Sequence, residues 1–195
     1  MTENKAVLIV GVGGQGTLLA SRILGKVLTD LGNDVKVSEV HGMSQRGGSV
    51  ETYVKYGEKV CSPVIKEGEA DTILSFEMLE AARYLPFLKK GGNIIVNTQQ
   101  LDPMSVITGS AVYPQGLREK LAAKGITVTG VDALALAEQA GSVKAVNIVL
   151  IGVMAAKSEI DKQIWLDAVC ATVPAKFREL NIKAFELGYG CICDE

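Results

Sequence analysis

The sequence predicts a protein of the α/β class, with three layers built around a mostly parallel sheet. Short apolar segments alternate with amphipathic helical segments over residues 5–140, an order typical of parallel strands joined by helices. A glycine-rich turn, Gly11-Val-Gly-Gly-Gln-Gly16, joins the first strand to the first helix. Only helical patterns follow Gly141. We therefore expect a Rossmann-like sheet with helices on both faces and a helical C-terminal part.

The first four elements have clear signals. Residues 5–10 form a continuous apolar run, typical of a central strand. The helix predicted over 17–31 places leucine, isoleucine and valine on one face, and Gly32 ends it. Residues 34–40 are predicted as the second strand. Residues 49–56 alternate apolar and polar side chains, and because only a loop precedes them we expect an antiparallel strand with one wet face.

The later elements follow from the same patterns. Strands are predicted at 71–76, 92–97 and 126–131, and helices at 77–88, 115–124, 132–140, 142–157, 161–173 and 174–188. The helix at 142–157 is apolar on all sides, so we expect it to be buried under a partner chain or inside this one. A buried amide needs hydrogen-bond partners. Asn147 in this helix therefore either bonds a loop of the chain or faces another subunit.

Length and charge exclude several classes of protein. The 195 residues predict one domain over 1–195. With 20 basic and 22 acidic side chains, the net charge is −2, which gives no reason to expect nucleic-acid binding. No apolar run approaches the ~18 residues that a membrane span needs. We therefore expect no membrane contact and a cytoplasmic location.

Histidine and cysteine usage limits the chemistry. His41 is the sole histidine, so one chain cannot build a metal site from several imidazoles, and a Ser-His-Asp triad would have to use His41. Four cysteines include no Cys-x-x-Cys pair, and we expect a reducing compartment and no bound metal. Cys170 is expected in the core. Cys191 and Cys193 are expected in a frayed C-terminal tail, the alternative being a redox pair or ligands shared with a partner.

The glycine turn has two interpretations. Gly11, Gly13 and Gly16 match G-x-G-x-x-G, in which backbone amides at a helix N-terminus approach a phosphate. Glu39 ends the second strand, where a ribose-binding acid would lie. In the alternative, the glycines only allow close packing or form an interface. With Gly14 and Gln15 at its two variable positions, the loop reads Gly-x-Gly-Gly-Gln-Gly, which is not a typical dehydrogenase loop.

A second loop, His41-Gly-Met-Ser-Gln-Arg-Gly-Gly48, carries Arg46, whose planar guanidinium suits a phosphate or carboxylate. In the alternative it is a plain polar loop, with Arg46 paired to Glu39 or Glu51. We expect both loops to meet at the carboxyl edge of the sheet, because their preceding strands should be neighbours through a right-handed crossover. The candidate residues for an anion, coenzyme A or subunit contact are Gly11, Gly13, Gly14, Gln15, Gly16, His41, Ser44, Gln45, Arg46, Gly47 and Gly48.

These two loops and the Asn147-x-x-x-x-Gly152 helix occur in an order that resembles one family. The chain is similar, over nearly its whole length, to the gamma-type subunits of 2-oxoacid:ferredoxin oxidoreductases. The His41-Gly-Met-Ser-Gln45 variant points to the indolepyruvate branch.

The resemblance implies the small subunit of a heteromer that decarboxylates a 2-oxoacid, forms an acyl-coenzyme A and reduces ferredoxin. It also implies that thiamine diphosphate, Mg²⁺ and [4Fe-4S] clusters lie on a large partner subunit, with none held by this chain alone. The catalytic residues stay unassigned. Two other functions remain open, a stand-alone NAD- or flavin-dependent reductase and a purely structural assembly subunit, and the isolated chain is also a candidate for self-association as a homodimer.

Overall fold

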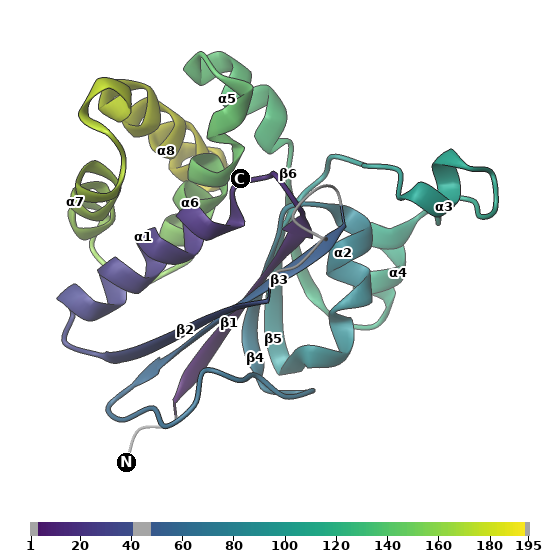
Figure 1. Ribbon diagram of the computed structural model, residues 1–195, viewed down its shortest axis with the longest axis horizontal. Coiled ribbons are helices and arrows are strands. Elements are labelled where there is room, and N and C mark those ends of the chain that lie inside the picture. The colour runs from purple at the N-terminus through teal and green to yellow at the C-terminus, as the bar shows by residue number, and fades with distance from the viewer. Residues whose placement is uncertain (1–3, 41–47, 194–195) are drawn as a thin grey trace.

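The computed structural model describes residues 4–40 and 48–193. Within them, six strands form one sheet in the order β2-β3-β1-β4-β5-β6 (Figure 1). The strands are β1 (Lys5–Val12), β2 (Asp34–Val40), β3 (Ser49–Gly57), β4 (Ala70–Ser75), β5 (Leu88–Asn97) and β6 (Thr127–Val131). The α-helices are α1 (Thr17–Asp30), α2 (Met78–Arg83), α3 (Met104–Ile107), α4 (Leu117–Ala123), α5 (Ala133–Ala140), α6 (Val146–Ala156), α7 (Lys162–Thr172) and α8 (Arg178–Cys193).

The sheet is mostly parallel, as predicted. β1, β4, β5 and β6 pair in parallel, whereas β3 pairs antiparallel with both β1 and β2. The antiparallel direction of β3 is confirmed, and its consequence for topology corrects one expectation. β1 and β2 are not neighbours, because β3 returns between them. We expected a crossover that places β2 directly beside β1. Instead, β3 runs antiparallel to β2 and pairs with β1.

Helices cover both faces of the sheet (Figure 1), which confirms the three-layer prediction. One core cluster joins alternate residues of β1, such as Val7 and Ile9, to apolar side chains of α1, α5, α6, α7 and α8. The other joins Leu8 and Val10 to α2 and α4. Because side chains alternate across a strand, the apolar residues 6–10 of β1 supply both cores at once.

The all-apolar helix α6 is buried inside the chain, so its composition carries no requirement for a partner. Residues from Val146 to Val153 are all buried, and the neighbouring helix α8 approaches closely. A Cβ built on Gly152 would lie 2.2 Å from the Phe185 carbonyl oxygen, and one on Gly188 would lie 2.1 Å from the Val149 carbonyl oxygen. Glycine at both positions therefore allows the two helix backbones to touch.

Several element boundaries differ from prediction. The predicted helix over 77–88 ends as α2 at Arg83, because Pro86 follows in a short 3₁₀ turn and β5 already begins at Leu88. The expected frayed tail is wrong, since α8 continues through Cys193, and the Cys191 thiol donates to the Gly188 carbonyl at 3.1 Å. Cys170 lies in α7 but is only partly buried, so its assignment to the core is also wrong.

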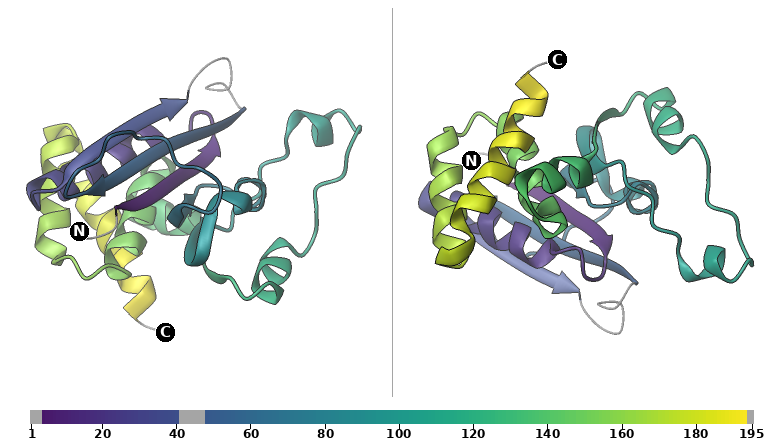
Figure 2. Two further views of the ribbon diagram at one scale, coloured as in Figure 1. Left: turned by 90° about the horizontal axis from the view of Figure 1, so that it is seen from below. Right: turned by 90° about the horizontal axis from the view of Figure 1, so that it is seen from above.

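Residues 98–116, which we call the arm, join β5 to α4 and contain the one-turn helix α3. Figure 2 shows this segment extending away from the sheet and its helices. Met104, Ile107 and Val112 are 66%, 65% and 86% exposed. The arm contributes Tyr113, which is 5% exposed, to the body of the protein. The arm is thus anchored at its base and exposes apolar side chains further out.

Candidate functional site

The glycine loop, Gly11–Gly16, is built on internal hydrogen bonds at the carboxyl end of β1. The side-chain oxygen of Gln15 accepts from the Val12 amide at 2.7 Å, and its nitrogen donates to the Phe76 carbonyl at 3.1 Å. A Cβ on Gly11 would meet that Gln15 oxygen at 2.8 Å and the Phe76 Cβ at 2.9 Å. Gln15 therefore fastens the loop to the end of β4, and Gly11 leaves room for it.

Asn147 completes the loop from the other side. Its side-chain nitrogen donates to the Gly16 carbonyl at 3.3 Å, and its oxygen accepts from the Ile148 amide at 2.9 Å. Gly16 has a left-handed backbone with φ of 86°. A Cβ there would lie 2.6 Å from the Asn147 nitrogen. Of the two alternatives for this buried amide, the internal one is correct: Asn147 bonds a loop of its own chain.

The described end of the second loop touches the first. The Gly13 amide donates to the Gly48 carbonyl at 2.8 Å, immediately before β3 begins. This contact meets the expectation of neighbouring loops, with β3 rather than β2 providing the adjacency. The other candidates of the second loop, His41, Ser44, Gln45, Arg46 and Gly47, lie outside the described residues.

Two clefts open on either side of the glycine loop. A cleft of about 290 Å³ lies between the glycine loop and the adjacent ends of two strands, the carboxyl end of β2 at Val40 and the amino end of β3 at Glu51. Another, of about 580 Å³, is lined by Gly14–Gly16, Gln99 and Lys144. Gly14 has φ of 102°, and among the described residues no atom beyond its chain neighbours lies within 4 Å of the position of a Cβ. Backbone at this point of the loop is therefore open to a ligand or a partner.

The position of Glu39 does not reproduce a dinucleotide site. That interpretation requires the acid at the end of a strand beside β1, but Glu39 lies on β2, one strand further away. The Ser21 hydroxyl donates to its carboxylate at 3.3 Å. Gln15 and Asn147 fill the space beside Gly11 and Gly16, the glycines that the motif uses for the tight turn and for helix–strand packing. The geometry favours close internal packing over a bound dinucleotide.

A buried carboxylate, that of Glu77, lies at the same edge of the sheet and was not predicted from the sequence. Glu77 is 1% exposed and caps α2 by accepting from the Glu80 amide at 3.0 Å. Its other oxygen accepts from the Leu101 amide at 3.3 Å and the Tyr113 hydroxyl at 2.5 Å. Burial, reinforced by this carboxylate, raises the pKa of Tyr113. Glu77 thus fastens both ends of the arm to the sheet.

Glu80, one turn later, is also buried. It accepts from the Ser49 hydroxyl and, at 2.9 Å, from Arg83. Burial raises the pKa of the Glu80 carboxyl above its usual value. The only signal for Glu77 and Glu80 in the sequence was their position directly after an apolar strand.

Comparison with known proteins decides the family. The model of the pyruvate ferredoxin/flavodoxin oxidoreductase family matches residues 6–191. The chain belongs to this family. It is 41% identical over 187 residues to the indolepyruvate oxidoreductase subunit IorB of Thermococcus kodakarensis, covering 93% of both chains. The corresponding subunit of Archaeoglobus fulgidus is 40% identical, with 94% of this chain and 92% of that one covered.

A solved structure gives the same result for the fold. The gamma subunit of a keto/oxoacid ferredoxin oxidoreductase from Geobacter sulfurreducens superposes with a TM-score of 0.73 at 25% identity, covering 98% of this chain and 99% of that one. In other members the same unit is part of a longer protein. The ketoisovalerate oxidoreductase subunit VorA of Methanothermobacter marburgensis is 27% identical, and the match takes in 93% of this chain but 35% of that protein.

The described side chains of this family member provide no cluster of ligands. Over residues 4–40 and 48–193, no three His, Cys, Asp or Glu side chains gather closely enough to hold a metal ion. None of the helices in the same part of the chain combines the length and apolar content needed to span a membrane.

Proposed function

We propose that the chain is the small subunit of an indolepyruvate-type 2-oxoacid:ferredoxin oxidoreductase located in the cytoplasm. The observation that carries this proposal is about 40% identity, over nine-tenths of both chains, to subunits named for indolepyruvate oxidation. The complex decarboxylates an aryl 2-oxoacid, transfers the acyl group to coenzyme A and passes the released electrons to ferredoxin. Residues 1–195 act in it as one gamma-type catalytic domain.

The division of labour follows from the same proposal. A large partner subunit carries thiamine diphosphate, Mg²⁺ and the [4Fe-4S] clusters, and ferredoxin reaches the complex through that partner. The lack of a metal-binding cluster among the described residues of this chain is compatible with that arrangement. No step of the reaction is assigned to a side chain described above.

The glycine loop and the loop of Arg46 form the proposed anion or subunit contact. The Gly13–Gly48 hydrogen bond joins the two loops, and the open backbone at Gly14 lies beside Lys144 in the cleft of about 580 Å³. α1 has no acidic residue in its first turn and no side-chain cap, so its N-terminal dipole is not neutralised locally. Such a surface suits a phosphate of coenzyme A or a carboxylate of the partner.

The arm is the proposed surface for the large subunit. It exposes Met104, Ile107 and Val112, and Glu77 holds its base in place. The fusion of this unit into a longer chain in VorA, where it makes up about a third of the protein, favours a permanent neighbour. Exposed apolar side chains held on a projecting segment are suited to such a contact.

Co-expression with a large subunit that carries thiamine and ferredoxin-type motifs tests the proposal. We expect the two chains to co-purify and to reduce ferredoxin in a reaction that requires coenzyme A, with a higher kcat/KM for indolepyruvate than for pyruvate or 2-oxoglutarate. Turnover by this chain alone, or stoichiometric NAD or flavin on it, would support the stand-alone reductase and refute the proposal. A preference for pyruvate would refute the indolepyruvate assignment alone.

Substitution of Arg46 tests the contact. Arg46→Ala should lower the turnover or assembly of the complex while the subunit stays folded, and Arg46→Lys should restore it only partly, since an ammonium lacks the two-pronged geometry. Arg22→Ala, at an exposed position of α1, is the matched control. Unchanged turnover in the assembled Arg46→Ala complex would leave the purely structural role as the better description of this loop.

A further inference from the structure

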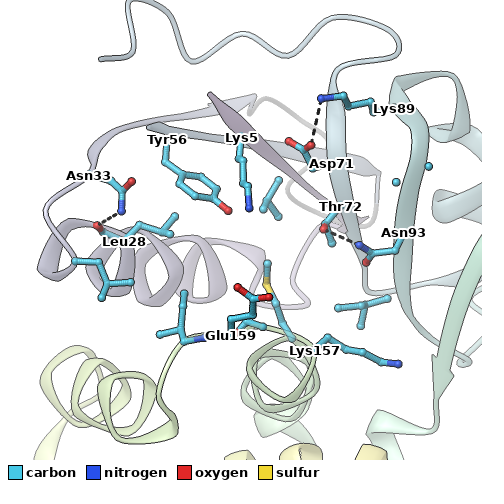
Figure 3. Close-up of a pocket in the computed structure, with 18 of the residues that line it drawn as sticks. Lys5, Leu28, Asn33, Tyr56, Asp71, Thr72, Lys89, Asn93, Lys157 and Glu159 are labelled. Atoms are coloured by element: carbon cyan, nitrogen blue, oxygen red, sulfur yellow. Dashed lines mark hydrogen bonds and ion pairs between the residues drawn. The ribbon is translucent and has the colours of Figure 1, made fainter. Parts of the chain in front are cut away.

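A second polar cleft lies at the opposite end of the sheet from the glycine loop. Its volume is about 730 Å³, and it opens between the amino ends of β1, β4 and β5 and the C-terminal ends of α1 and α6 (Figure 3). Pockets of this size accommodate small organic molecules. Nothing in the proposed function uses this cleft.

Positive charge dominates its lining. Lys5, Lys89, Lys90 and Lys157 line the cleft with two acidic residues, Asp71 and Glu159. Asp71 is already engaged, by the Ala6 amide at 2.8 Å and by Lys89 at 3.6 Å. Within the described residues, the side-chain ammonium groups of Lys5, Lys90 and Lys157 make no hydrogen bond or ion pair. A net positive cleft on a chain of net charge −2 favours an anionic ligand.

The walls supply groups for orientation and for apolar contact. Figure 3 shows the Tyr56 hydroxyl and the Lys5 ammonium pointing into the cleft from the sheet, with Glu159 facing them from the helical side. Burial raises the pKa of Tyr56, which keeps its hydroxyl protonated as a donor. On the helical side, Leu31 is 44% exposed, and Met154 and Ile160 are partly buried. The cleft therefore combines an apolar wall with a basic rim.

The helix ends that border the cleft do not prevent anion binding. Helix C-termini carry partial negative charge on unsatisfied carbonyls. Here the Asn33 side chain and backbone amide both donate to the Leu28 carbonyl, at 3.0 and 3.1 Å. At the end of α6, the Ser158 hydroxyl donates to the Ala155 carbonyl at 2.8 Å. These caps satisfy the carbonyls that would otherwise repel an anion.

We propose that this cleft binds an amphipathic organic anion, a molecule with an apolar body and one acidic group. Lys5 attracts the acidic group and Tyr56 donates a hydrogen bond to it, whereas Lys157, which extends away from these two residues in Figure 3, adds positive charge to the rim. The wall of Leu31, Met154 and Ile160 contacts the apolar body. Glu159 opposes the anion and so limits its affinity. The proposal is independent of the reaction assigned to the complex, since it rests on the lining of this cleft alone.

A pair of fluorescent probes tests the proposal on the full chain. Anilinonaphthalene sulfonate is an amphipathic anion, and phenylnaphthylamine is the same ring system without the sulfonate. We expect the sulfonate to bind saturably with a stoichiometry of one, to shift the amide NMR signals of Gly91 and Gly92 at the mouth of the cleft, and to weaken with added salt. The neutral probe should bind several times more weakly.

Three variants assign the site. The double variant Lys5→Gln with Lys157→Gln should weaken sulfonate binding about fivefold and leave the neutral probe unchanged, whereas Glu159→Gln should strengthen it. Lys124→Gln, an exposed lysine at the end of α4, is the control and should have no effect. Equal affinities for the two probes, an unchanged affinity in the double lysine variant, or NMR shifts confined to the arm would each overturn the proposal.

Discussion

Gly14 and Gly16 have the same left-handed backbone but different surroundings, which makes them a matched pair. A non-glycine residue in this conformation costs about 1–2 kcal/mol. A Cβ at Gly14 would meet no atom of the described, non-adjacent residues within 4 Å, whereas at Gly16 it would lie 2.6 Å from the Asn147 side chain. We expect Gly16→Ala to lower the free energy of unfolding by at least about 1 kcal/mol more than Gly14→Ala, measured by urea denaturation. Equal losses would show that Asn147 moves aside freely.

The side-chain pKa values of Glu80 and Glu69 should lie on opposite sides of the ordinary pKa of a glutamate. Burial raises the pKa of Glu80, whereas the Lys66 amide and the Lys55 ammonium lower the pKa of Glu69. Between its unfolded and folded pKa, folded Glu80 holds a proton that the unfolded chain has lost. Its contribution to the free energy of unfolding therefore falls as pH rises through that window, whereas the contribution of Glu69 is lost as pH falls through its folded pKa. Carboxyl NMR titration should give a midpoint above 4.5 for Glu80 and below 4.5 for Glu69; the reverse order would contradict the burial argument.

At the scale of elements, the contact between α6 and α8 depends on two glycines. The position of a Cβ on Gly188 is 2.1 Å from a backbone oxygen, which no change of rotamer can relieve. We expect Gly188→Ala to destabilise the protein by about 3 kcal/mol or more, as measured by thermal or urea unfolding. For Gly190 in the same helix, no atom of the described residues outside the local helix backbone lies within 4 Å of the position of a Cβ. Gly190→Ala should be neutral or stabilising by up to about 1 kcal/mol, and a similar loss at both positions would show that helix distortion, not the interhelical contact, is responsible.

The arm should loosen when its anchor is weakened. Tyr113→Phe keeps the ring in place but removes the 2.5 Å hydrogen bond to Glu77, at a cost of about 1–3 kcal/mol because the buried carboxylate loses a donor. We expect faster amide exchange at Leu101 and faster proteolysis within residues 104–112, with unchanged exchange in β1 and β4. Uniformly faster exchange throughout the sheet would indicate global destabilisation instead.

At the scale of the whole molecule, assembly should depend on the apolar side chains of the arm. Met104→Ser with Ile107→Ser should reduce co-purification of the large subunit while the melting temperature of the isolated chain is unchanged, because both side chains are mostly exposed. Val64→Ser, which alters a 51% exposed valine outside the arm, is the control. Full assembly of the double variant would place the partner on another surface.

Local patterns predicted the layers of the fold, and long-range pairing decided what they could not predict. The apolar run of β1, the Asp132 cap of α5 and the alternation of β3 each depend on neighbours in sequence. The position of β3 between β1 and β2 depends on backbone pairing across the sheet. The periodicity of apolar residues along the sequence does not predict which strands pair. The apolar composition of α6 predicted that this helix is buried. Nothing in the sequence predicted that α8 is the helix that packs against it.

The candidate site was predictable to a similar extent. The spacing of its glycines predicted the glycine loop. Its contact with Gly48 was predictable because both loops were expected at the carboxyl edge of the sheet. The hydrogen bonds that hold this loop, made by Gln15 to Phe76 and by Asn147 to Gly16, could not be predicted, because these residues are far apart in the sequence and meet only in the folded chain. Glu77 was missed for the same reason: a glutamate after a strand is ordinary until Leu101 and Tyr113 converge on it.

Leu101 and Tyr113, on either side of residues 102–112, both donate hydrogen bonds to the Glu77 carboxylate. Residues 102–112 therefore form a loop whose two ends are held at one point of the protein. Its entry and exit are defined by Glu77 rather than by anything at its tip, so its length and sequence are free to change without altering the sheet. We expect a segment with that property to tolerate replacement as a unit, independently of the body of the protein. Grafting the corresponding residues of another family member between Leu101 and Tyr113 should therefore transfer partner choice, and leave the host fold as stable as before.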